Sequence, residues 1–191
     1  MLDECALLLD EVGYDALTTK EVARRAEVPI GTFYQFFSDK QGLVRALAQR
    51  NLDAFLARIG VRIAEVGLSH WSGLIDLAID EFVLMKRTTP GFAIVDFGEV
   101  RAAPGGPTLL GTDRMLDEAL ENNVIVADRL RALTIDLLAP EGKGLDRALR
   151  VAVEAADAVL KLAFRDYPQG DPELVTECKN LVRRYLAEHL P

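Results

Sequence analysis

The chain has 191 residues, of which 50% are hydrophobic, and a formal net charge of -8 at pH 7. This length can bury the core of one domain, or of a small domain joined to a larger one. Because the sequence contains neither an apolar run of membrane-spanning length nor a signal-peptide pattern, we predict a cytoplasmic protein. Cys5 and Cys178 lack a CxxC spacing and are expected to be buried packing thiols, with redox sensing as the open alternative.

Two short helices separated by a turn are predicted near the start of the chain, after a first helix over residues 2–13. Thr18 and Glu21 have the spacing of a capping box, so the second helix should begin near Thr18. Glu27-Val28-Pro29 should end it, because the residue before a proline disfavours the helical region. Proline itself suits the first turn of a new helix, predicted over residues 30–37. This pattern indicates a helix-turn-helix.

The third predicted helix has the features of a helix that reads DNA. Gly31 and Thr32 leave its beginning with little side-chain bulk, so that end can approach a groove closely. Tyr34 can offer its hydroxyl to a phosphate, and Gln35 its amide to a base edge or a phosphate. Three phenylalanines fall in or next to this helix. We expect the core to receive Phe33 and one or both of Phe36 and Phe37.

Another capping box, Ser38 to Gln41, opens the next predicted helix. The free amides at a helix start favour an anion, and Lys40 adds a positive charge beside them, so a phosphate site is predicted there. Together these elements resemble the DNA-binding domain of the TetR family of transcriptional regulators. The resemblance is carried by Gly31-Thr32-Phe33-Tyr34, Phe37 and Lys40.

The resemblance implies an all-α fold with two domains. Residues 1–45 would form a three-helix DNA-binding domain with a helix-turn-helix, and residues 46–191 a larger helical ligand-binding and dimerisation domain. The sequence departs from the family at Phe36, where a histidine or another polar residue is common, and a DNA contact would be lost there. It also opens at Met1-Leu2-Asp3 without a short basic arm, either because the sequence starts late or because this member grips DNA less tightly.

Ten residues are predicted to contact DNA. They are Thr18, Thr19, Lys20, Arg24, Ile30, Gly31, Thr32, Tyr34, Gln35 and Lys40. The structural alternatives are that Arg24 and Arg25 are solvated surface, Tyr34 is half-buried core and Lys40 only assists a cap. Residues 16–50 carry six Lys or Arg against three Asp or Glu, a charge of +3 that leaves -11 elsewhere. A local basic face can still bind phosphates, because charges more than about 8 Å apart are screened at physiological salt.

Further helices are predicted in the body of the chain. Their ranges are residues 38–66, 71–87, 113–138, 145–165 and 172–189. The stretch 91–113 is rich in glycine and proline and is predicted to be the most mobile. The last two helices combine small residues with a wide apolar stripe, which favours a homodimer interface, although they could instead complete the monomer core.

A small-molecule pocket in the body is implied by the family resemblance, and the bulky residues of the middle helices are its candidate lining. These are Trp71, Phe82, Met85, Phe92, Phe97, Met115 and Phe164, with Asn123 as a polar anchor, and each could equally be plain core. His70 and His189 are the only histidines and have no catalytic partners by spacing, and neither a metal cluster nor a phosphate loop is evident. We therefore predict no enzyme and no cofactor.

The sequence predicts a TetR-like DNA-binding regulator, a repressor released from a palindromic double-stranded operator by a small hydrophobic effector. The alternative is a helical small-molecule-binding or adaptor protein whose DNA-binding head is weak or vestigial, as the net acidity allows.

Overall fold

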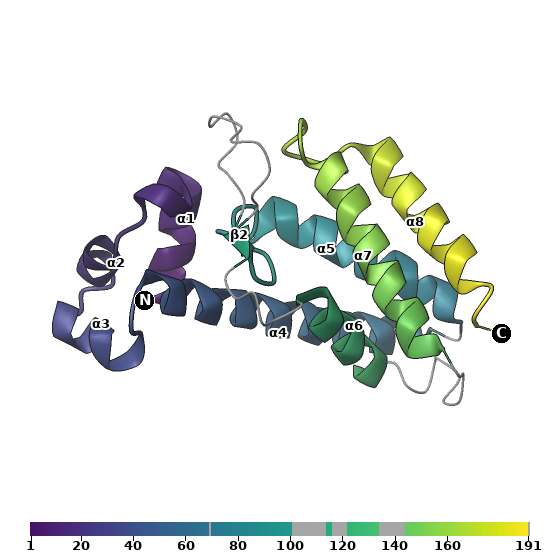
Figure 1. The fold of residues 1–191 in the computed structure, drawn as a ribbon, viewed down its shortest axis with the longest axis horizontal. Helices are drawn as coiled ribbons and strands as arrows, with labels where there is room; N and C mark the ends of the chain where they lie inside the picture. The colour runs from purple at the N-terminus through teal and green to yellow at the C-terminus, as the bar shows by residue number, and fades with distance from the viewer. Residues whose placement is uncertain (69, 101–113, 116–121, 134–143, 191) are drawn as a thin grey trace. The chain divides into compact units, whose positions relative to one another are not determined.

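The computed structural model describes residues 1–68, 70–100, 114–115, 122–133 and 144–190 (Figure 1). The chain divides into two compact units. The first contains Met1–Asp53 and Thr88–Ala119, and the second contains Ala54–Arg87 and Leu120–Pro191. Within the described residues, no helix combines the length and the apolar character needed to cross a membrane.

The first unit is built on α1 (Leu2–Ala16), α2 (Thr19–Arg25), α3 (Ile30–Phe36) and the first half of α4 (Lys40–Val66). These are the helices predicted from the sequence. Helix α1 is interrupted by non-helical geometry at Gly13 and continues for one further turn. The predicted capping box at Ser38 is corrected, because α4 begins one residue later than expected. The Asp39 side chain caps it, accepting a hydrogen bond from the Gly42 amide at 2.7 Å.

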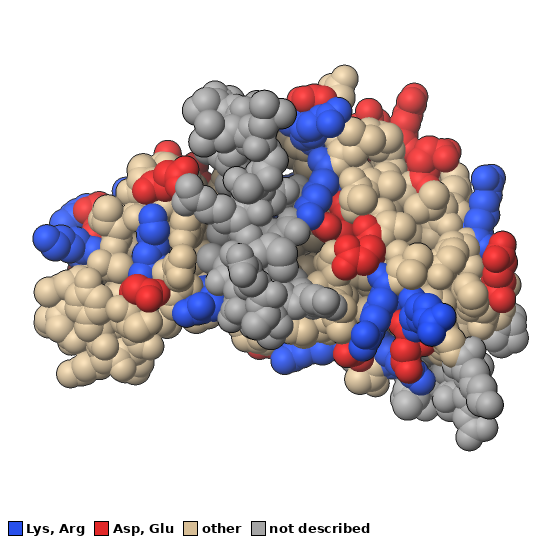
Figure 2. Space-filling model, viewed as in Figure 1, with Lys and Arg blue, Asp and Glu red and all other residues tan. Residues whose placement is uncertain are grey.

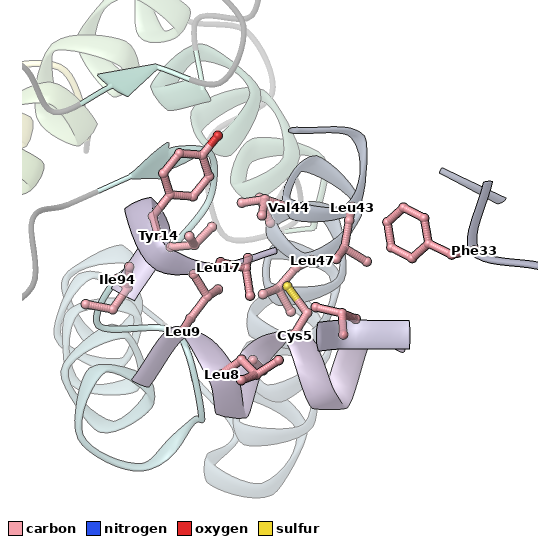
Figure 3. Close-up of a cluster of buried hydrophobic side chains, with 14 of the residues drawn as sticks. Cys5, Leu8, Leu9, Tyr14, Leu17, Phe33, Leu43, Val44, Leu47 and Ile94 are labelled. Carbon is pink, nitrogen blue, oxygen red and sulfur yellow. The ribbon is translucent and has the colours of Figure 1, made fainter. Parts of the chain in front are cut away.

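The apolar core shown in Figure 3 holds the first unit together. Helices α1, α2, α3 and α4 each contribute fully buried side chains, of which the largest are Leu8, Leu9, Val22, Phe33, Leu43, Val44 and Leu47. Burying one such side chain stabilises a fold by about 1.5–3 kcal/mol. Ile94 and Val95, which follow α5 in the sequence, belong to the same core. The small core of the first helices is therefore completed by a segment from elsewhere in the chain.

Polar contacts hold this later segment in place. The buried amide of Asn51 in α4 donates hydrogen bonds to the carbonyl oxygens of Val95, at 3.0 Å, and Asp96, at 3.3 Å. The Asp10 carboxylate accepts a hydrogen bond from the Gly91 amide at 2.8 Å. Residues 91–96 thus form a packed part of the first unit, whereas the sequence suggested only a breaker-rich connection. Residues 101–113 of that predicted mobile stretch lie outside the described residues.

The chain then forms a short antiparallel ladder between β1 (Glu99–Val100) and β2 (Arg114–Met115). A helix starting near residue 113 was expected, and that start was wrong, because residues 114 and 115 pair with β1. The predicted helix is represented by α6 (Asn122–Leu133), and residues 116–121 and 134–143 fall outside the description. The all-α fold class holds, since each strand of this ladder is only two residues long.

The second unit contains the rest of α4, α5 (Trp71–Thr88), α6, α7 (Leu145–Ala163) and α8 (Pro172–Leu186). Helix α8 starts as the sequence suggests, with Pro172 in its first turn and the Asp171 side chain accepting from the Glu173 and Leu174 amides. Two ion pairs join α8 to α5, Lys179 with Asp80 at 2.5 Å and Arg183 with Asp76 at 2.9 Å. The core of this unit centres on Trp71, Leu145, Ala148, Val182 and Leu186.

Candidate nucleic-acid interface

Helices α2 and α3 and their connecting turn form the predicted helix-turn-helix. The Thr18 side chain caps α2 by accepting a hydrogen bond from the Glu21 amide at 3.2 Å. The turn passes through Glu27, whose φ of 54° is unusual for a residue other than glycine. The Val28 amide then donates to the Ala23 carbonyl at 3.0 Å, and Pro29 precedes α3. The sequence predicted this turn, but not the left-handed residue inside it.

Helix α3 has one buried face and one exposed face. Phe33 is fully buried and packs against Tyr34 and Phe37, with ring centroids 5.3 Å and 5.5 Å away. Phe37 is half-buried against the core, whereas Phe36 is exposed. Of the two phenylalanines left open by the sequence, Phe37 is therefore the inward one. Outside this packed face lie the exposed residues Ile30, Gly31, Tyr34 and Gln35, with Thr32 half-buried.

A hydrogen bond between side chains links the two helices of the motif. The hydroxyls of Thr19 in α2 and Tyr34 in α3 lie 3.2 Å apart. Because the Tyr34 ring also packs on Phe33, the position of its hydroxyl is fixed from both sides. Tyr34 is thus an exposed group of fixed geometry, which suits a contact that sets the docking register.

The arginines of α2 are paired with carboxylates. Arg24 makes two hydrogen bonds to Glu21, at 2.9 Å and 2.6 Å, and Arg25 makes two to Glu11. The Arg24 hydrogen bonds lower the pKa of Glu21 to about 2, and the Glu21 and Glu11 hydrogen bonds raise the pKa values of Arg24 and Arg25 respectively. The predicted charge of +3 already includes Glu21, and Glu11 adds one more negative charge beside Arg25. Lys20 is exposed on the same helix.

Lys40 contacts the end of α1. Its ammonium donates to the carbonyl oxygens of Tyr14 at 3.0 Å and Asp15 at 3.4 Å, and lies 4.3 Å from the centroid of the Tyr14 ring. A cation at this place stabilises the carbonyl end of a helix. At the start of α4, the Asp39 carboxylate already accepts the hydrogen bond that the Gly42 amide could otherwise donate to a phosphate. The predicted phosphate site therefore has its own anion in this structure, and phosphate binding by Lys40 stays a prediction.

The second unit contains an almost wholly apolar cavity of about 80 Å³ among α5, α6, α7 and α8. Its lining consists of Leu74, Ile75, Ala78, Ile79, Ala127, Leu130, Leu149, Ala152, Val153, Ala156, Val182 and Leu186. A second, open groove of about 250 Å³ lies between the end of α4 and α5 and includes Arg62, Asp80 and Glu81. Among the residues that the structure describes, no group of His, Cys, Asp and Glu is arranged to hold a metal ion.

Among the pocket residues predicted from the sequence, those whose side chains the structure describes line neither hollow. Phe92 and Phe97 belong to the first unit, where their rings contact each other edge to face at 5.4 Å. The side chain of Met115 lies outside the description. Trp71, Phe82, Met85, Asn123 and Phe164 belong to the second unit. The sequence drew attention to aromatic residues, whereas the cavity is lined by aliphatic ones, which carry no distinguishing signal in a helical core.

Comparisons with known proteins agree with this geometry. Residues 2–47 match the model of the bacterial regulatory proteins of the tetR family, and residues 69–190 match that of the tetracyclin repressor-like C-terminal domain. A curated relative, an uncharacterized HTH-type transcriptional regulator YvkB of Bacillus subtilis, is 45% identical over 51 residues. That match spans only 27% of this chain and 27% of the relative.

Solved structures extend the likeness to the whole chain. A TetR-family transcriptional regulator from Streptomyces coelicolor is 42% identical, with a TM-score of 0.81 over 99% of this chain and 96% of that one. The fatty acid degradation regulator FadR from Bacillus halodurans shares the fold at 16% identity, with a TM-score of 0.61 and 95% of each chain covered. The family model of the C-terminal domain alone matches more than half of the chain. The protein therefore belongs to the TetR family of transcriptional regulators, with an N-terminal DNA-binding domain and a C-terminal ligand-binding domain.

Proposed function

We propose that this chain is a homodimeric repressor that places α3 of each protomer in the major groove of a palindromic operator and is released by a small hydrophobic effector. The observation that carries the proposal is the two-sided character of α3. Phe33 packs one side of α3 against the core. On the other side, the exposed residues are Ile30, Gly31, Tyr34 and Gln35. A helix-turn-helix protein reads base edges with such a face. A regulator of this kind acts in the cytoplasm.

The proposed DNA contacts are the ten residues predicted from the sequence, in a DNA-binding domain of residues 1–45. Groups outside α3 would position the protein on phosphates: Thr18, Thr19, Lys20, Arg24 and Lys40. Tyr34, held by Thr19, would join them. Ile30, Gly31, Thr32 and Gln35 would lie nearest the bases. Arg24 can bind a phosphate by exchanging the Glu21 carboxylate for it.

The proposed dimer forms through α7 and α8, in the domain of residues 46–191. Exposed apolar side chains on these helices support it, notably Val151, Leu162 and Leu181. Two copies related by a twofold axis would match half-sites one helical turn apart, about 34–36 Å. Because one head carries few unpaired cations, binding would depend on both heads engaging together.

The apolar cavity supports the effector part of the proposal. Its lining contains only aliphatic side chains, so it would favour an uncharged hydrocarbon group over a polar one. Release from DNA requires the effector to bind the DNA-incompetent conformation more tightly, by the same free energy that it removes from operator affinity.

The DNA part is tested by selecting duplexes from genomic or random DNA with the full chain and measuring their affinity across a salt series. A regulator should prefer one palindromic sequence. Lys20→Ala should weaken binding to all sequences and reduce the slope of log affinity against log salt by about 1. A well-folded dimer without DNA binding would contradict the proposal.

The effector part is tested by filling the cavity. Ala152 lines it and is buried, so Ala152→Leu should occupy the space, while Ala132→Leu changes an exposed site on α6 and serves as the control. A series of n-alkanols from butanol to octanol should raise the thermal midpoint of the wild type and the control and weaken their operator binding, with less effect on Ala152→Leu. An equal response of all three proteins would exclude this cavity as the site.

The alternative function, a ligand-binding or adaptor protein with a weak DNA-binding head, is favoured by one observation. Arg24 and Arg25 are paired with Glu21 and Glu11, so α2 offers little uncompensated positive charge. Such a protein would respond to the alkanols but show no sequence preference in the DNA selection.

A further inference from the structure

The exposed surface of α3 has no charge and is largely apolar. The helix, IGTFYQF, contains neither a basic nor an acidic residue. Three of its large side chains are nevertheless exposed to solvent, Ile30 by 40%, Tyr34 by 54% and Phe36 by 68%. In Figure 2 the surface over α3 is uncharged, whereas basic and acidic side chains gather over α2. The surface that would face DNA therefore differs from the salt-sensitive basic face usual for phosphate contacts.

The apolar side chains lie at the two edges of the polar exposed surface of α3. Successive residues of a helix are about 100° apart, so residues four apart lie on the same side. Ile30 therefore lies beside Tyr34 on one flank, and Phe36 beside Thr32 on the other. Gly31 and Gln35 lie between them, and a Cβ atom added at Gly31 would meet nothing within 4 Å. This surface can approach a base-pair edge closely at Gly31, with an apolar side chain at each of its two edges.

Major-groove chemistry supplies a matching apolar group. The base edges there present hydrogen-bond donors and acceptors, together with one hydrocarbon group, the 5-methyl of thymine. Apolar side chains discriminate thymine by contacting this methyl. The flanks of α3 are continuous with the reading surface of the helix-turn-helix, so DNA is the occupant that this position favours over a protein partner.

We propose that Ile30 and Phe36 are specificity-determining residues that select thymine in each half-site through apolar contact with its 5-methyl group. The proposal rests on the proposed function. It assigns a direct contact to Phe36, the position at which the sequence suggested that a contact was lost. It also gives α3 a source of affinity that releases no counterions and is therefore insensitive to salt.

A methyl scan tests this proposal on the duplex that the full-length protein selects from a random-sequence pool. Each thymine is replaced in turn by uracil, which removes only the methyl group. At one or more positions in each half-site the wild type should lose affinity by about fourfold, the factor that corresponds to one buried methyl group. Ile30→Ala and Phe36→Ala should each lose sensitivity to uracil at a different position, with unchanged salt slopes.

Lys20→Ala provides the matched control, since it should reduce the salt slope while keeping the full uracil effect. Because Ile30 and Phe36 are exposed, their alanine variants should keep the wild-type thermal midpoint. Affinity that is insensitive to uracil at every position, or equally sensitive in the wild type and both variants, would overturn the methyl contact while leaving the proposed function intact. Variants that keep operator affinity but change self-association would overturn it in favour of a protein-docking role. Selection that enriches no duplex would overturn both proposals.

Discussion

Gly91 lies where the segment after α5 meets α1, and a methyl group added there has no room. Its φ is +73°, a conformation that L-residues rarely adopt, and a Cβ atom would lie 2.9 Å from both the Cα and the carbonyl oxygen of Ala6. The conformation is held by the hydrogen bond from the Gly91 amide to Asp10. Left-handed geometry costs about 1–2 kcal/mol, and overpacking against backbone about 1–3 kcal/mol. Gly91→Ala should therefore destabilise the first unit by about 2–5 kcal/mol.

Gly67→Ala separates the two contributions. Gly67 has a similar φ of +64°, but an added Cβ atom would meet nothing within 4 Å, so this variant should lose only about 1–2 kcal/mol. Urea unfolding followed by circular dichroism would measure both losses in free energy of unfolding. For a chain of this size the thermal midpoint should fall by roughly 2–4 °C per kcal/mol. Equal losses in the two variants would refute the steric argument at Ala6, and no loss in either would refute the conformational one.

Three further predictions concern polar groups and thiols. Asn51→Leu removes the amide that donates hydrogen bonds to two buried carbonyl groups, so it should lower the free energy of unfolding in urea by about 2–4 kcal/mol. A loss below about 0.5 kcal/mol would contradict this. Burial raises the pKa of Cys5 to about 12 and that of Cys178 to about 11, so neither thiol should react with Ellman's reagent at pH 8 until the chain is unfolded, when both should. The pKa of Glu21 is lowered from 4.5 to about 2 by its hydrogen bonds from Arg24, so its stabilising contribution is complete above pH 4.5 and is lost as the pH falls towards 2. The thermal midpoint of Glu21→Gln should accordingly fall less than that of the wild type across this range, and parallel curves would contradict the assignment.

The helix-turn-helix could be predicted from the sequence because its signals are local. Thr18 caps α2 three residues before Glu21, and Pro29 separates two helices that each pack one or two apolar residues inward. Such signals depend only on neighbouring residues, so they survive without knowledge of the tertiary fold. The exposure of Phe36 beside the half-buried Phe37 could not be predicted, because adjacent residues of the same type differ only in which one the core can reach.

The packing of residues 91–96 against the first helices could not be predicted from the sequence either. Gly91 has the composition signal of a loop, and the apolar run after it is too short to identify as strand or helix. Within this segment the Gly91 amide binds Asp10, 81 residues away, and the Val95 carbonyl binds Asn51, 44 residues away. No local sequence pattern predicts contacts between residues so far apart. A polar residue within a predicted helix, as Asn51 is, normally indicates solvent exposure, whereas this one is buried.

Lys40 shows how the same signal can serve two purposes. A cation beside a helix start predicts a phosphate site, but a cation also stabilises the carbonyl end of another helix, and the sequence does not show which helix end lies closer. Here the ammonium meets Tyr14 and Asp15, while Asp39 supplies the anion at the start of α4. An ammonium has three N–H groups, so these two contacts leave capacity for a phosphate oxygen. If Lys40 binds DNA, the phosphate joins a site already ordered by α1. A substitution there would then disturb the head itself as well as its contact, which makes Lys20 the better residue for measuring phosphate binding alone.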